Sequence, residues 1–182
     1  PDVFNPRYSY AAGKIISEVL AINNSKLFKK LIIFRPHNVY GPNMGFEHVI
    51  PQIILRMKNK KKKFKKINFK IQGNGNETRS FNHIDDFVRG FIKILEKGKH
   101  LNIYNIGTQE EIRIKDLVML IAKNLNYKIN IKKSPVSKGS TSRRCPDISK
   151  LKKLGYYPKL KIKEGIKEVI KWYTNPINLK KN

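Results

Sequence analysis

Short apolar runs of strand length alternate along this chain with longer segments that place apolar side chains at helical spacing. Leu31–Phe34 is one continuous apolar run, which is typical of a strand buried on both faces of a sheet. Residues 8–23 instead have the apolar spacing of an amphipathic helix. Alternation of this kind predicts an α/β fold. The other expected helices are 47–60, 85–97, 114–125, 147–154 and 162–173, and the other expected strands are 69–71, 80–84, 102–106 and 129–131.

Glycine-rich and polar segments are expected to connect these elements. Gly73-Asn-Gly75 lacks the third glycine and the following helix of a phosphate-binding turn, so it predicts a hairpin turn between two strands. Residues 134–142 predict a polar loop, and the tail after Asn175 is expected to fray. Asp85 and Asp147 each precede a helical segment, and both are expected to act as helix caps.

The residues that could suggest a metal site have simpler interpretations. Asp85 and Asp86 are adjacent, but acidic residues are favoured at a helix N-terminus by the helix dipole. His48, His83 and Cys145 do not have the spacing of zinc ligands. We therefore expect no metal. A single cysteine also leaves no partner for an internal disulfide and suits a reducing compartment.

The formal net charge of +26 allows two interpretations. A basic surface could bind nucleic acid or anionic lipid. Alternatively, the composition is biased toward lysine, asparagine and isoleucine, and the charge has no function of its own. We favour the compositional bias, because the charge is spread along the chain and its densest run, Lys58–Lys66, predicts a solvated helix end and loop. The apolar runs are too short to span a membrane, so no membrane partner is expected.

Tyr10 and Lys14 stand four positions apart at the start of the first helical segment. Positions i and i+4 share one face of a helix, so a phenol and an ammonium are expected side by side. A neighbouring cation favours the phenolate, and the pair can therefore transfer a proton. Such spacing also occurs in ordinary amphipathic helices, so the pair needs support from the rest of the chain.

That support comes from the order of several further motifs. In order, these segments are Tyr8-Ser-Tyr-Ala-Ala-Gly-Lys-Ile-Ile-Ser-Glu18, Phe34-Arg-Pro-His-Asn-Val-Tyr-Gly-Pro42, Arg79-Ser-Phe-Asn-His-Ile-Asp-Asp86, Tyr104-Asn-Ile-Gly107 and Arg143-Arg-Cys-Pro-Asp-Ile-Ser-Lys150. The series closely resembles the C-terminal half of the extended short-chain dehydrogenase/reductases, the NAD-dependent sugar-nucleotide epimerases and dehydratases. The resemblance runs from the first residues to about Tyr173.

The resemblance implies a role for each matching residue. Tyr10 would be the catalytic base and acid, and Lys14 would hold the nicotinamide ribose and assist the tyrosine. Pro36 and His37 would lie beside the cofactor, and Asn38 would contact the substrate's sugar or diphosphate. On its residue type alone, His37 is more often a packing or hydrogen-bonding residue than an acid or base. The cofactor implied is NAD, with NADP left open.

Two arginines are candidates for binding a diphosphate. Arg79 and Arg144 fall within the matching segments, and the planar guanidinium suits phosphate. Arg143 is nearly as good a candidate as Arg144. In a chain this basic, any of these arginines could instead be an ordinary surface cation.

The chain begins without methionine, and Pro1-Asp-Val-Phe-Asn-Pro6 predicts an extended loop. It has no glycine-rich dinucleotide turn, so we expect it to be the C-terminal part of a longer protein. Residues 1–42 would be the last part of a Rossmann domain. Residues 43–182 would form a smaller α/β substrate-binding lobe, from which about 85–107 return to the Rossmann domain.

The reaction expected from the resemblance is 4-epimerisation through a transient 4-keto sugar. Sugar-nucleotide 4,6-dehydration and decarboxylation of a nucleotide-uronic acid remain alternatives, because all three begin with the same oxidation. The family likeness also implies a nucleotide-sugar substrate, a cytoplasmic location and a homodimer. A basic nucleic-acid-binding module is a remote alternative, since only Phe64 interrupts the dense lysine run. A member that binds without catalysis is disfavoured by the intact Tyr10 and Lys14.

Overall fold

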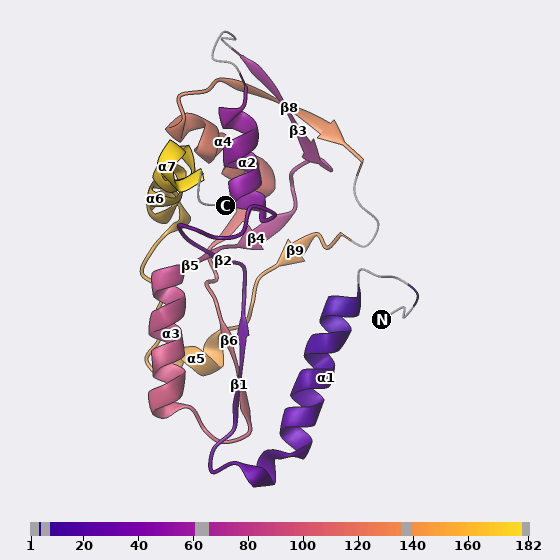
Figure 1. Cartoon of the computed structure of the whole chain (residues 1–182), viewed down its shortest axis with the longest axis vertical. Coiled ribbons are helices and arrows are strands. Elements are labelled where there is room, and N and C mark those ends of the chain that lie inside the picture. Colours follow the sequence, from indigo (N-terminus) through magenta and orange to yellow (C-terminus); the bar gives the residue numbers. More distant parts are fainter. Residues whose placement is uncertain (1–3, 5–7, 61–65, 136–139, 180–182) are drawn as a thin grey trace.

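The computed structural model describes residue 4 and residues 8–60, 66–135 and 140–179. Its elements form two packed regions, one above the other in Figure 1. The lower region contains α1 (Ser9–Asn23), η2 (Ser25–Leu27), β1 (Ile32–Pro36), α3 (Ile84–Lys97), β6 (Asn102–Ile106) and α5 (Ser149–Lys152). The upper region contains α2 (Val49–Lys58), β3 (Ile67–Gln72), β4 (Thr78–Ser80), β7 (Glu111–Arg113), α4 (Ile114–Asn124), β8 (Ile129–Ser134), β9 (Arg143–Arg144), α6 (Ile162–Thr174) and α7 (Pro176–Leu179). The short strands β2 (Val39–Tyr40) and β5 (Asn82–His83) lie where the two regions meet.

Most strand pairs in the described residues are parallel, and the predicted α/β class is confirmed. β1 pairs with β6, β2 with β5, and β3 with β8, all in parallel. The remaining sheet has the order β7-β4-β9, in which β4 is antiparallel to β7 and parallel to β9. Each parallel pair joins segments that are far apart in the sequence.

The upper region has a closed apolar core. Helices α2, α4 and α6 pack against one another, and α4 also packs against β8. The apolar side chains of β3 alternate with exposed ones, so one face of the strand is buried. The largest fully buried side chains of this core are Tyr40, Ile50, Ile54, Met57, Phe69, Leu117, Ile121 and Tyr173.

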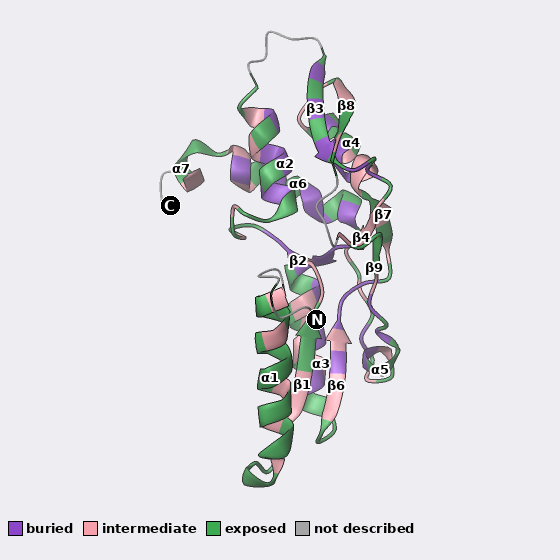
Figure 2. Ribbon diagram, turned by 90° about the vertical axis from the view of Figure 1, so that its right-hand side faces the viewer, coloured by how far each residue is buried: buried purple, intermediate pink, exposed green. Residues whose placement is uncertain are grey.

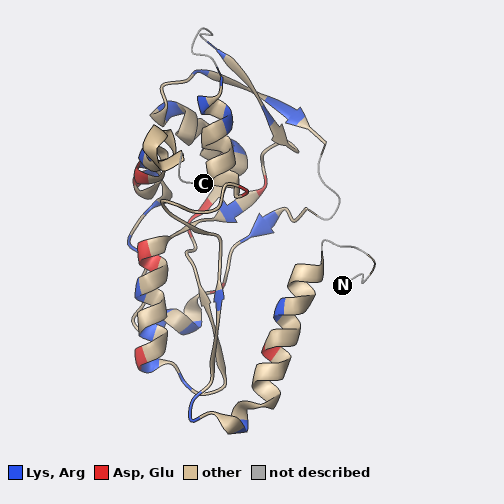
Figure 3. Ribbon diagram, in the orientation of Figure 1, with Lys and Arg blue, Asp and Glu red and all other residues tan. Residues whose placement is uncertain are grey.

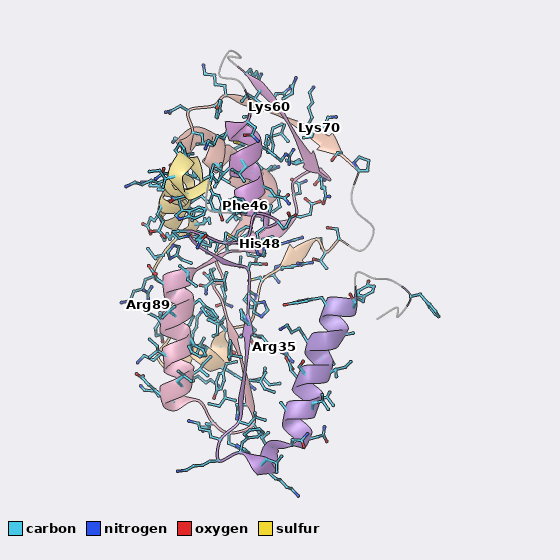
Figure 4. The ribbon with its side chains drawn as sticks, viewed as in Figure 1. Arg35, Phe46, His48, Lys60, Lys70 and Arg89 are labelled. Carbon is cyan, nitrogen blue, oxygen red and sulfur yellow. The ribbon has the colours of Figure 1, made fainter. Side chains whose placement is uncertain are left out.

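The lower region is more open. Its buried cluster consists of side chains from α3, β6 and the segment around α5, namely Ile94, Tyr104, Ile106, Ile148, Leu151 and Tyr156. No residue of α1 is buried, and Figure 2 shows the helix as exposed and half-exposed along its length. Arg35 on β1 is labelled in Figure 4. Its Nη2 lies 2.5 Å from Oε2 of Glu18, and this ion pair joins α1 to the strand.

The expectation that Leu31–Phe34 is buried on both faces was wrong. Ile32 and Ile33 are half-buried and Phe34 is exposed. The ring of Phe34 contacts Phe91 of α3 at a centroid distance of 5.0 Å, so α3 covers one face of the strand. The described residues cover the other face only in part, because α1 contacts β1 through the Arg35–Glu18 ion pair but buries none of its own residues (Figure 1).

The hairpin expected at Gly73-Asn-Gly75 was also wrong, since the strands on either side do not pair with each other. β3 pairs with β8, whereas β4 pairs with β7 and β9. The segment instead turns the chain from one sheet into another. Gly73 and Gly75 adopt φ angles of 64° and 76°, which glycine reaches without the cost of a Cβ clash. The expected strand over 80–84 is likewise divided between β4 and β5, which belong to different sheets.

Three expectations need correction: the cap of α3, the end of the helix after Asp147 and the conformation of the residues after Asn175. The cap of α3 is His83, whose side chain accepts a hydrogen bond from the Asp85 amide, so Asp85 lies inside the first turn. Asp147 Oδ1 does accept from the Ser149 amide, but the helix ends at Lys152. Residues 176–179 of the tail that was expected to fray form α7. Residues 61–65 and 136–139 of the expected loops 58–66 and 134–142 lie outside the described residues, while Lys58 belongs to α2 and Ser134 to β8.

Candidate functional site

The upper region contains a pocket of about 430 Å³ whose lining mixes charged, amide and aromatic side chains. Its walls come from α2, β3, β4, α4, β9 and the segment before β2. Its charged and polar lining residues include Asn38, Gln52, Arg56, Glu77, Arg79 and Arg144. A cleft that is partly apolar, with a few convergent polar groups, has the character of a small-molecule site.

Arg79 and Arg144 lie directly opposite each other in the parallel strands β4 and β9. The Arg79 guanidinium donates to the carbonyls of Thr78 (2.7 Å) and Thr141 (2.8 Å), and Arg144 Nε donates to Thr141 Oγ1 (2.8 Å). Burial lowers the pKa of Arg79, and the positive charge of Arg144 lowers it further, while Glu77 opposes this. Two neighbouring cations repel each other, so an anion bound between them would relieve the repulsion.

Arg143 does not line this pocket. Its Nη2 donates to Glu111 Oε1 at 2.6 Å, and its Nε lies within hydrogen-bond distance of both carboxylate oxygens. These hydrogen bonds lower the pKa of Glu111 and raise that of Arg143. Successive side chains of a strand point to opposite faces, which explains why one of the two adjacent arginines pairs with Glu111 and the other lines the pocket.

Asn38 reaches the pocket from the junction between β1 and β2. Its backbone has a φ of 41°, and its Nδ2 donates to the Ser80 carbonyl at 3.0 Å. His37 lies next to it but bonds within the lower region. Its backbone N–H donates to the Ile106 carbonyl at 2.9 Å, and its Nε2 lies 3.2 Å from Asn105 Oδ1. Pro36 ends β1 just before it.

Tyr10 and Lys14 share one face of α1, as their spacing predicts. Lys14 Nζ lies 5.5 Å from the centre of the Tyr10 ring, and Tyr10 is 76% exposed. Neither residue lines the pocket. The structure therefore gathers Asn38, Arg79 and Arg144 around one cavity and leaves Tyr10 and Lys14 on a separate, solvent-facing helix.

Sequence reasoning missed the part of the pocket that α2 and β3 contribute. The Arg56 guanidinium stacks 4.3 Å from the centre of the Phe69 ring, and its Nη2 donates to the Lys70 carbonyl at 2.6 Å. Gln52 lies one helical turn before Arg56 on the same face of α2. Both side chains are exposed, on the side of α2 away from its buried apolar residues. Their i, i+4 spacing on that side was the signal that could have identified them.

In the described ranges, no group of three or more histidine, cysteine, aspartate or glutamate side chains could hold a metal ion. Asp85 and Asp86 lie in the first turn of α3. Asp86 is fully buried, accepts hydrogen bonds from the amides of Lys159 and Leu160 at 2.9 Å each, and pairs with Arg89. Its role is therefore to join α3 to the segment before α6.

Comparison with known proteins identifies the family. The profile of the NAD dependent epimerase/dehydratase family matches residues 1–107. The chain belongs to the NAD-dependent epimerase/dehydratase family. It is 34% identical over 186 residues to the dTDP-D-glucose 4,6-dehydratase of Homo sapiens, and the match covers 97% of this chain and 51% of that protein. The chain thus spans about half the length of this epimerase/dehydratase relative.

Solved structures of epimerases and dehydratases share the fold. The UDP-glucuronic acid 4-epimerase from Bacillus cereus, in complex with UDP-glucuronic acid and NAD, superposes with a TM-score of 0.80 at 27% identity, covering 91% of this chain and 52% of that one. The dTDP-glucose 4,6-dehydratase DesIV from Streptomyces venezuelae, with NAD and TYD bound, gives 0.78 at 26% identity, covering 91% and 50%. Both resemblances run through both regions of this chain. In the residues that the structure describes, no helix has the length and apolar character needed to cross a bilayer.

Proposed function

We propose that the protein containing this chain is an NAD-dependent sugar-nucleotide epimerase, a 4-epimerase that acts through a transient 4-keto sugar. The observation that carries the proposal is the pocket, where Arg79 and Arg144 face each other beside Asn38. Guanidinium groups match phosphate oxygens in geometry and charge, so this wall suits a diphosphate. At the other wall, the Arg56 guanidinium is stacked on the buried Phe69 ring, and its outer face suits the flat face of a base.

A second candidate is a sugar-nucleotide 4,6-dehydratase, favoured by the 34% identity to the human dTDP-D-glucose 4,6-dehydratase. Both reactions begin with oxidation of a sugar hydroxyl, so the same pocket and the same first proton transfer serve either one. Product analysis of the complete protein separates them, because a dehydratase releases a 6-deoxy-4-keto sugar and an epimerase releases an isomer of its substrate.

Tyr10 and Lys14 are the residues that we propose for the proton transfer. They are one helical turn apart and exposed, so both can reach a molecule bound above that face of α1. Tyr10 would take the proton from the sugar hydroxyl, and the charge of Lys14 would favour the resulting phenolate. General acid–base catalysis of this kind contributes about 10²- to 10⁴-fold to a rate.

The residues present fit NAD in part. Lys14 offers an exposed ammonium for ribose hydroxyls. Pro36 ends β1 of the parallel pair β1–β6 and His37 follows it, and nucleotides bind outside the carboxyl ends of the strands in such sheets. NAD, when bound, supplies the hydride acceptor for the sugar carbon. We assign residues 1–42 and about 85–107 to the cofactor domain and the rest of 43–182 to the substrate lobe.

We further propose that the protein acts in the cytoplasm as a homodimer. The support for the dimer is α1, where Ile15, Ile16 and Leu20 are all more than half exposed. Contiguous exposed apolar surface of this kind usually marks a contact with protein. Light scattering on the complete protein tests the assembly, and a monomer at micromolar concentration rejects it.

The pocket assignment is tested by titrating UDP, dTDP and GDP into the protein by calorimetry. Arg79→Ala and Arg144→Ala should each weaken the best of these ligands by about 1.5–3 kcal/mol, the range for hydrogen bonds to charged groups. Arg143→Ala is the matched control, because this adjacent arginine pairs with Glu111 and does not line the pocket. If Arg143→Ala weakens binding as much as Arg144→Ala, or if none of the three nucleotides binds, the proposed site is wrong.

A further inference from the structure

Beside the pocket, the buried side chain of His83 connects two elements that are distant in the sequence. Its side chain is 1% exposed, and its Nε2 lies 2.6 Å from Glu168 Oε1 on α6. Its Nδ1 accepts a hydrogen bond from the Asp85 amide at 3.3 Å. Because Nδ1 accepts, the proton of the neutral ring is on Nε2, which donates to Glu168. Both ring nitrogens are therefore used, and the ring orientation is fixed from both sides.

Helix α6 approaches this histidine closely because Gly165 has no side chain. A Cβ at Gly165 would lie 2.4 Å from Tyr40 Oη and 2.8 Å from His83 Cδ2. The rings of Tyr40 and His83 are themselves in edge-to-face contact, with centroids 5.2 Å apart. β2, β5 and α6 thus meet at one point, with Glu168 at its edge.

The charged groups at this point are mostly carboxylates. Burial raises the pKa of Tyr40, and Glu110, Asp86, Glu168 and Glu164 raise it further, so its phenol stays neutral. Asp85 Oδ2 lies 3.6 Å from the Nδ1 of His83. A Glu168 carboxylate placed among other acids gains from a hydrogen-bond donor, and His83 supplies one.

The strand that carries His83 also determines where the pocket residues lie. β5 pairs with β2, with Asn82 opposite Val39 and His83 opposite Tyr40. The Asn82 amide donates to the Asn38 carbonyl at 3.1 Å, and the Asn38 side chain donates back to the Ser80 carbonyl at 3.0 Å. Arg79 immediately precedes Ser80. Movement of β5 would therefore displace Asn38 and Arg79 together.

We infer that the hydrogen bond between His83 and Glu168 is a positioning link, which holds the β2–β5 pair against α6 and so keeps Asn38 and Arg79 on one pocket wall. The effect on ligand binding rests on the proposed function, whereas the effect on the β2–β5 pair does not. Neither residue touches the pocket, since neither is among its lining residues.

Glu168 is the side chain to change, because 51% of it is exposed and its removal leaves no large cavity. Glu168→Ala deletes the acceptor, and Glu168→Gln keeps an acceptor oxygen in the same place. Glu96→Ala is the matched control, since Glu96 is also 51% exposed and pairs with a neighbouring residue, Lys93, away from the pocket. His83→Asn keeps a side-chain oxygen that can cap α3 but is too short to reach Glu168.

The first measurement is hydrogen exchange of the Asn82 amide, which donates across the β2–β5 pair to Asn38. It needs no ligand. Glu168→Ala and His83→Asn should accelerate this exchange by about tenfold, the factor expected for losing a hydrogen bond to a charged group. Glu168→Gln should restore most of the protection, and Glu96→Ala should leave it unchanged. Unchanged exchange in Glu168→Ala, with the fold intact by circular dichroism, overturns the proposal.

The second measurement is the dissociation constant for UDP in the same variants. Glu168→Ala should weaken UDP binding by about threefold or more, a typical size for coupling through packed elements, and Glu168→Gln should recover it. Faster exchange together with unchanged UDP affinity would overturn the coupling to the pocket. If the parent protein binds no nucleoside diphosphate, the proposed function fails, while the exchange experiment still decides whether the link holds the β2–β5 pair.

Discussion

The helices of the upper region bury their apolar side chains, whereas the first helix of the lower region leaves its apolar side chains exposed. In the upper region, α2, α4 and α6 each bury four or more side chains among one another. In the lower region, α1 has apolar residues at the same spacing and buries none. Burial therefore depends on a second layer being present as well as on the pattern of the helix. Charge does not separate the regions, since Lys and Arg are spread over both (Figure 3).

The largest expected effect tests whether the lower region carries the proton transfer while the pocket of the upper region binds the nucleotide. If the complete protein has the proposed activity, Tyr10→Phe should lower turnover by about 10²- to 10⁴-fold, because it removes the proton carrier and keeps the ring. Binding of nucleoside diphosphate should stay at the parental level, since Tyr10 does not line the pocket. Steady-state kinetics and calorimetry measure the two quantities. Turnover within about tenfold of the parent would remove Tyr10 from the mechanism.

A smaller effect is expected on the free energy of unfolding when one leucine from each region is replaced by alanine. Leu117 is fully buried in the upper core, so Leu117→Ala should lower the free energy of unfolding by about 2–5 kcal/mol. Leu20 on α1 is 59% exposed, so Leu20→Ala should change the stability of this chain by less than about 0.5 kcal/mol. Urea unfolding monitored by circular dichroism measures both. Similar losses for the two variants would show that α1 is packed in solution.

The smallest expected effects come from a pair of helical glycines. Gly165→Ala should destabilise the chain by about 1–3 kcal/mol, because the new methyl group would overlap Tyr40 and His83. Gly13→Ala should stabilise α1 by up to about 1 kcal/mol, since nothing lies within 4 Å of the added Cβ and alanine is the better helix former.

Thermal unfolding tests Gly165→Ala, and amide exchange along α1 tests Gly13→Ala. A gain in stability for Gly165→Ala would mean that α6 packs more loosely on the β2–β5 pair than the structure shows. Slower unfolding of the whole chain in Gly13→Ala would mean that α1 contributes more to its stability than its contacts indicate.

The sequence predicted where helices and strands lie better than it predicted which strands pair with each other. The strand over 102–106 and the helix over 162–173 follow from local spacing, and the structure places them within one residue of those bounds. The hairpin at Gly73-Asn-Gly75 failed because glycine spacing records the local turn and not which strand pairs with which. The cap of α3 was missed because histidine is an uncommon cap, and its role depends on Glu168 holding the ring.

The candidate site was predictable only in part. The family resemblance named Asn38, Arg79 and Arg144, which the fold gathers around one pocket. Which of two adjacent arginines faces that pocket could not be predicted, because it depends on the pairing of β9 with β4. The stacking of Arg56 on Phe69 joins a helix to a strand, and only the tertiary packing brings them together. The roles of Tyr10 and Lys14 stay predictions.

The parallel pairing of β4 with β9 has a consequence for the time at which the pocket forms. Arg79 and Arg144 meet only after the whole intervening chain has been made and β9 has found its register beside β4. Contacts between distant segments close slowly, because the loop entropy is lost before the contacts form. During synthesis, α2 and β3 therefore emerge well before Arg144, and this wall of the pocket cannot form until Arg144 has been made.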